Sequence, residues 1–165
     1  MASGDVLARW EASDGKPPTT AFASLVRRNN HLVAAFDAAT DEALDFTSFL
    51  RGYTALGMTV RIAWTSDTAI TGNVIWDGSF EAHADDAAAG DLDADSFAAV
   101  QSVTVAAPSA AGEVVYDEIA FTNGAQIDSI ATGEWFRFRL NRDANNASDT
   151  MAGDAHLVAV EIRET

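Results

Sequence analysis

The sequence predicts an all-β protein, an antiparallel β-sandwich of the jelly-roll type, for three reasons. Apolar and polar residues alternate with a period of two along most segments, which is typical of half-buried strands and not of helices. Turn residues separate roughly eight to ten short segments of this kind, as in sandwiches and barrels. The large apolar residues, including nine Phe and four Trp, favour strands. Since a typical domain has about 150 residues, we expect a single jelly-roll domain over residues 1–165.

Six strands are expected in the first half of the chain. Their predicted ranges are 5–10, 21–28, 31–37, 42–46, 58–65 and 74–82. In the first strand one face carries Val6, Ala8 and Trp10. The alternation is clearest in 58–65, where one face carries Met58, Val60, Ile62 and Trp64. Gly78, inside the sixth strand, indicates a β-bulge or a close approach of another segment.

The second half begins with a different composition. Residues 84–99 are rich in Asp, Ala and Gly, so we expect a long loop there, with one helical turn capped by Asp95. Strands are then predicted at 100–106, 113–122, 134–141 and 154–163.

The charge balance excludes two classes of partner. The formal net charge is −15, with 25 acidic and 10 basic residues, and Lys16 is the only lysine. A nucleic-acid-binding surface needs clustered basic residues, and an anionic membrane surface repels an acidic protein. We therefore expect neither nucleic acid nor membrane as a partner. Met1–Asp5 contains no basic or apolar stretch of a secretory signal, so synthesis in a cytoplasm is expected.

The residues that usually carry catalysis or bind cofactors are sparse. The chain contains no cysteine, no nucleophile-elbow motif and no phosphate-binding glycine loop. Its histidines, His31, His83 and His156, lie in separate segments, and His156 is expected to point toward the core because it alternates with Val158, Val160 and Ile162. We expect no catalytic residue, no cofactor and no metal. A glycan-processing enzyme, which needs two carboxylates about 5–9.5 Å apart, stays as a further hypothesis.

The acidic loop could chelate Ca²⁺ through alternate aspartates. Its aspartates are Asp85, Asp86, Asp91, Asp93 and Asp95. An EF-hand counted from Asp91 fails, however, because positions 6 and 12 are Ser96 and Ser102 instead of Gly and Glu. A solvated acidic loop is the simpler interpretation.

Trp135, Arg137 and Arg139 form the most conspicuous candidate site. Phe136, Phe138 and Leu140 are expected in the core, which places the other three side chains together on the outer face. Because Trp and Arg are enriched at interface hot spots, this strip predicts a partner interface. The alternative is that the arginines pair with carboxylates of the same molecule and a loop covers Trp135.

Trp64 and Trp76 have two possible roles. As an exposed pair they would form a platform for stacking sugars. Both alternate with aliphatic residues on strong strands, which indicates packing in the core.

Two stretches give the chain a family resemblance. They are Thr132–Asp143 followed by Asp149–Ile162, and Leu92–Phe97 together with Met1–Asp5. A strand ending in Arg-Asp, a polar loop with Asp-Thr-x-x-Gly-Asp and a last alternating strand resemble small virion proteins of tailed bacteriophages, in particular head decoration or cement proteins. The resemblance implies a jelly roll that binds the major capsid protein as a homotrimer on the outer surface of the head, after assembly in the host cytoplasm.

The function expected from this resemblance is non-enzymatic stabilisation of a phage capsid. A net charge of −15 agrees with a location away from a packaged polyanionic genome. The alternative is a glycan- or host-binding β-sandwich module of a phage tail or fibre.

Overall fold

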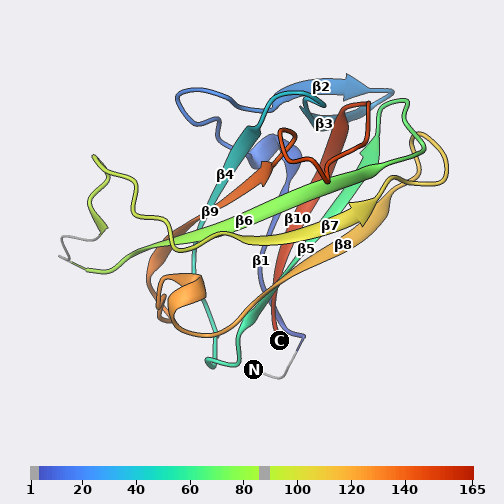
Figure 1. The fold of residues 1–165 in the computed structure, drawn as a ribbon. Coiled ribbons are helices and arrows are strands. Elements are labelled where there is room, and N and C mark those ends of the chain that lie inside the picture. The colour runs from blue at the N-terminus through green and yellow to red at the C-terminus, as the bar shows by residue number, and fades with distance from the viewer. Residues whose placement is uncertain (1–3, 86–89) are drawn as a thin grey trace.

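The computed structural model describes residues 4–85 and 90–165, and in these ranges the chain folds into two antiparallel sheets packed face to face (Figure 1). The described part contains ten strands: β1 (Val6–Glu11), β2 (Ser24–Arg28), β3 (His31–Phe36), β4 (Glu42–Phe49), β5 (Met58–Ser66), β6 (Asn73–His83), β7 (Gln101–Ala106), β8 (Val115–Phe121), β9 (Trp135–Arg142) and β10 (Ala155–Glu164). Two short 3₁₀ turns, Ala12–Asp14 and Ala125–Ile127, lie between strands. The predicted antiparallel β-sandwich of the jelly-roll type is confirmed.

The first sheet is built around β10. Its strand order is β2-β3-β10-β5-β8, and β1 also pairs with β10. One edge of β10 pairs with β5 over almost its whole length, while the other edge pairs first with β3 and then with β1. The chain's last strand is thereby enclosed on both sides by earlier strands.

The second sheet has the order β4-β9-β6-β7. β9 lies between β4 and β6, with Phe138 opposite both Phe46 and Phe80. Its outward side carries the candidate site.

The core between the sheets is aromatic. Trp64 of the first sheet and Trp76 of the second are fully buried, and their rings meet edge to face with centroids 5.8 Å apart. Gly78 lies where another segment approaches the backbone closely, which is one of the two possibilities predicted from the sequence. An added Cβ would lie 2.9 Å from the Phe121 ring and 3.0 Å from the Phe138 ring, so the absence of a side chain lets the two sheets meet there.

Two predicted strand faces are correct on one side of a β-bulge and wrong on the other, because the bulge shifts the phase of the side chains; Trp10, Val160 and Ile162 pack in or against the core as predicted. In β1 the register shifts between Val6 and Ala8, which leaves Val6 half exposed and buries Leu7. In β10 the shift lies between Leu157 and Ala159. His156 consequently lies opposite Thr65 on the outer face and does not point toward the core, where Leu157 packs.

Residues 91–99 form no helical turn, so the predicted cap at Asp95 is also wrong. Asp95 instead uses its side chain in the site described below. No helix in the ranges that the structure describes is long and apolar enough to cross a membrane.

Candidate functional site

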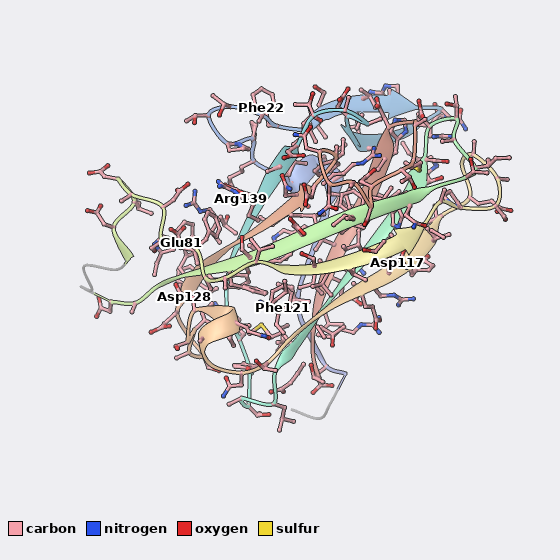
Figure 2. The ribbon with its side chains drawn as sticks, in the orientation of Figure 1. Phe22, Glu81, Asp117, Phe121, Asp128 and Arg139 are labelled. Carbon is pink, nitrogen blue, oxygen red and sulfur yellow. The ribbon has the colours of Figure 1, made fainter. Side chains whose placement is uncertain are left out.

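A groove of about 930 Å³ crosses the outward face of the second sheet. β9 provides the centre of its floor with Trp135, Arg137, Arg139 and Asn141. The flanking strands add Asp45 and Thr47 from β4 and Asp77 and Ser79 from β6. Residues 16–21 form one wall, and Asp95 and Val100 contribute to the other. In Figures 1 and 2 these two connecting segments lie on the same side of the molecule, with Phe22 on one and Glu81 near the base of the other.

Strand register places each of the two arginines opposite one carboxylate. Arg139 lies opposite Asp45 of β4, and Arg137 lies opposite Glu81 of β6. Because these pairs are direct cross-strand neighbours on one face, opposite charges there stabilise the sheet. The alternation that buries Phe136 and Phe138 thus also assembles an ionic cluster on the outer face.

Arg139 holds Asp45 in a two-point contact. Its Nε donates to Asp45 Oδ1 at 2.7 Å and its Nη2 donates to Oδ2 at 2.8 Å. Asp45 is only 4% exposed, so its charge is buried against this guanidinium. This geometry fixes the plane of the arginine side chain.

Arg137 pairs with a fully buried glutamate through a single carboxylate oxygen. Its Nε donates to Glu81 Oε2 at 2.7 Å, and its Nη2 lies 2.6 Å from the same oxygen. Nη1 also approaches Asp45 Oδ2 at 3.4 Å. Asp45 and Glu81 together therefore balance the charge of the two arginines.

The segment that follows the acidic loop covers this cluster. The Phe97 ring lies over both guanidinium groups, with centroid distances of 4.5 Å to Arg137 and 4.4 Å to Arg139. The Ser96 N–H donates to Glu81 Oε1 at 2.6 Å. Asp95 forms an ion pair with Arg137 Nη2 and lies 3.5 Å from Arg139 Nη1.

Trp135 stands at one end of the groove. It lies opposite His83 of β6, and the two rings are 4.5 Å apart. His83 Nδ1 is in turn 3.0 Å from the carbonyl oxygen of Gly90. Trp135 is half-buried, so it presents part of an aromatic surface to the groove while its neighbour restrains it.

Two aspartates of the groove have shifted pKa values in opposite directions. The hydrogen bond from Arg137 lowers the pKa of Asp95, because a cationic donor favours the ionised carboxylate. Burial raises the pKa of Asp77, although Ser102 donates a hydrogen bond to it. Over the whole groove the charged lining residues are three cations and four aspartates: Lys16, Arg137, Arg139, Asp41, Asp45, Asp77 and Asp95.

The three residues of the predicted strip all line this groove. Both arginines are paired within the molecule, as the alternative interpretation of the strip requires, and Trp135 stays partly exposed. Their role in a partner interface stays a prediction. Sequence reasoning missed Asp45 and Glu81, whose only signal was an outward position on their own predicted strands.

Two other candidate sites behave differently. Trp64 and Trp76 are wholly buried, so the sugar platform is wrong and core packing is correct. In the acidic loop that could chelate Ca²⁺, Asp86 lies outside the described residues, and the Asp95 carboxylate is paired with Arg137 and Arg139. In the rest of the described chain no group of three His, Asp or Glu side chains is placed to hold a metal ion.

The sequence matches no protein-family model and no curated protein. Among solved structures, a carbohydrate-binding module CBM36 in complex with calcium and xylotriose is similar over 94% of this chain and 99% of that chain, with 16% identity and a TM-score of 0.50. The CBM36-1 domain of a multidomain xylanase from the hindgut metagenome of Trinervitermes trinervoides matches over 94% of each chain, with 9% identity and a TM-score of 0.53.

A third similar structure is a whole enzyme. It is the isomalto-dextranase of Arthrobacter globiformis T6 complexed with panose, with 14% identity and a TM-score of 0.55 over 93% of this chain but 22% of that chain. At these identities the similarity shows a shared fold.

These comparisons overturn the resemblance to phage virion proteins, because the similar structures are carbohydrate-binding modules and domains of glycan-active enzymes. The residues that suggested it, the Arg-Asp strand end and the Asp-Thr-x-x-Gly-Asp loop, lie at the end of β9 and in the connection to β10, where Arg142 and Asp149 form a buried ion pair that serves the fold. The capsid partner, the homotrimer and the virion location rested on that resemblance, and nothing in the structure tests them.

Proposed function

We propose that the protein is a non-catalytic glycan-binding module and that the groove over β4, β9 and β6 is its binding site. The observation that carries the proposal is the groove itself. It is an open channel with two walls and a polar floor, and one aromatic side chain stands at its end. Ligand sites are typically concave and combine an apolar surface with a few fixed polar groups.

The floor offers the chemistry that a sugar needs. A pyranose ring has an apolar C–H face, which the exposed part of Trp135 can contact, and pairs of adjacent hydroxyls, which planar polar groups can bind at two points. Asn141 and Asp77 supply such groups beside the arginines. Since ion pairs already fix the arginines, binding costs little side-chain entropy there.

The ionic cluster itself is poorly suited to glycoside hydrolysis, and Asp77, whose pKa is raised by burial, is the groove carboxyl group that a hydrolase would have to use. A hydrolase needs one carboxyl group that stays protonated near neutral pH as a general acid. Asp45, Glu81 and Asp95 are each paired with a guanidinium, and the pKa of Asp95 is lowered. The ion pairs make these three carboxylates restraints on the arginine side chains.

The fold supports the proposal by analogy. A CBM36 module of this fold was solved with calcium and xylotriose, so xylo-oligosaccharides belong among the first ligands tested. Because that complex contains calcium, binding should be measured both with added Ca²⁺ and with a chelator.

The test is a glycan array followed by calorimetry on the full chain. We expect saturable binding of at least one oligosaccharide class, and Trp135→Ala should weaken it at least about tenfold, which corresponds to about 1.4 kcal/mol. Tyr116→Ala is the matched control, because Tyr116 is an aromatic residue exposed on the other sheet. The proposal is wrong if the wild-type protein binds no glycan, or if both variants bind as tightly as wild type.

A further inference from the structure

The outer ends of Arg137 and Arg139 form a position where a carboxylate fits between two guanidinium groups. In the structure the side chain of Asp95 occupies it (Figure 2 shows Arg139 and Glu81 at this site). We propose that Asp95 makes the groove selective for uncharged glycans by filling this position and repelling acidic sugars. The inference rests on the proposed glycan-binding function and adds the class of ligand.

Two buried carboxylates already accept hydrogen bonds from the Nε–H groups of Arg137 and Arg139, on the side of the guanidinium groups that faces the sheet. The side chains of Asp45 and Glu81 are 6% and 0% exposed, and they neutralise the two cations. Asp95 is different, because its side chain is 58% exposed and lines the groove. It therefore adds one negative charge at the surface that a ligand meets.

The main chain near Asp95 is held by contacts other than its carboxylate. The Ser96 N–H bonds to Glu81, and the Ala98 N–H donates to the Phe80 carbonyl at 2.8 Å. Phe97 stacks on both arginines. A substitution that removes only the Asp95 carboxylate should therefore leave the wall of the groove in place.

Without that carboxylate the position becomes an anion site. The side chains of Arg137 and Arg139 are 22% and 24% exposed, so their outer N–H groups are accessible from the groove. Paired guanidinium groups bind carboxylates through charge-assisted hydrogen bonds. Asp95→Ala should therefore bind sugars that carry a carboxylate, while the wild-type protein rejects them.

The experiment compares two small sugars that differ in charge. Glucuronate and methyl glucoside are titrated into the protein, and the Nε–H signals of Arg137 and Arg139 are followed by ¹⁵N NMR. We expect glucuronate to bind Asp95→Ala at least tenfold more tightly than wild type, and the gain to shrink at high salt because charged groups are screened. Methyl glucoside should show no such gain.

Asp93→Ala is the matched control, since it removes an exposed carboxylate from the same segment and changes the net charge equally. Asp95→Asn provides a second variant that keeps the side-chain shape, and it should also gain affinity for glucuronate. The inference is overturned if neither Asp95 variant binds glucuronate more tightly than Asp93→Ala. That result would not affect the test of the proposed function, because that test measures the binding of neutral glycans and the effect of Trp135→Ala.

Discussion

Arg142 lies wholly inside the sandwich at the end of β9, and all five of its N–H groups have acceptors. Two of them reach Asp149, where Nη2 donates to Oδ1 at 2.8 Å and Nε donates to Oδ2 at 3.1 Å. The others reach main-chain carbonyls of Phe36, Met151 and Gly153. Asp149 also accepts from the Ile75 N–H, so this pair ties the loop before β10 to both sheets.

Replacing Arg142 by Lys should lower the free energy of unfolding by about 3–5 kcal/mol. A lysine keeps the charge but has three donors at the end of a flexible stem, so at least two of the five buried acceptor contacts of Arg142 are lost. Urea denaturation measures the change. Arg163→Lys is the control at a partly exposed pair with Glu161 and should cost less than about 1 kcal/mol. A similar small loss for both variants would show that the buried network contributes little.

At the scale of strands, alternation alone predicts the elements well. The pattern in 58–65 and 134–141 predicts β5 and β9 to within one residue at each end, because side chains of one phase are buried in the core. Alternation contains no information about which strands become neighbours. Arg139 and Asp45 are 94 residues apart in sequence, and Arg137 and Glu81 are 56 apart, so the ionic floor of the groove could not be predicted.

Bulges are the second feature that alternation misses, since one inserted residue reverses the face of every side chain before it. The bulge in β10 turns His156 outward, where its Nδ1 lies 3.1 Å from Arg28 Nη1. Arginine is always a donor, so His156 must accept this hydrogen bond as a neutral ring. Burial and the charge of Arg28 lower the pKa of His156, and the opposing effects of Asp67 and Asp154 do not restore it.

This lowered pKa makes stability depend on pH. In the unfolded chain His156 takes up a proton near pH 6.5, whereas in the folded chain it does so only at lower pH. Protonation therefore favours the unfolded chain, and stability is lost as the pH falls through and below 6.5. We expect the urea concentration at the midpoint of unfolding to decrease when the pH is lowered from 7.5 to 5.5. This decrease should be smaller in the His156→Gln variant. His31→Gln removes an exposed histidine from β3 and should leave the decrease unchanged. Equal pH dependence in wild type and His156→Gln would contradict this account.

At the scale of the whole molecule the net charge of −15 dominates, and much of it lies on exposed loops. Charge of one sign keeps a protein soluble but destabilises its compact state through self-repulsion. The ion pairs of Arg142, Asp45 and Glu81 are buried, so dissolved salt screens them less than the surface charges. Adding salt should therefore relieve repulsion more than it weakens these pairs.

We accordingly predict that the melting temperature rises between 10 and about 200 mM NaCl, over which the Debye length falls from about 30 Å to less than 10 Å. A gain of about 1 kcal/mol would raise the melting temperature by about 2–4 °C in a chain of this size. Differential scanning calorimetry measures the rise, and KCl at the same ionic strength should give the same result, because the effect is screening and not ion binding. A melting temperature that falls over this range would mean that attractive ion pairs, and not self-repulsion, control the electrostatic stability of the sandwich.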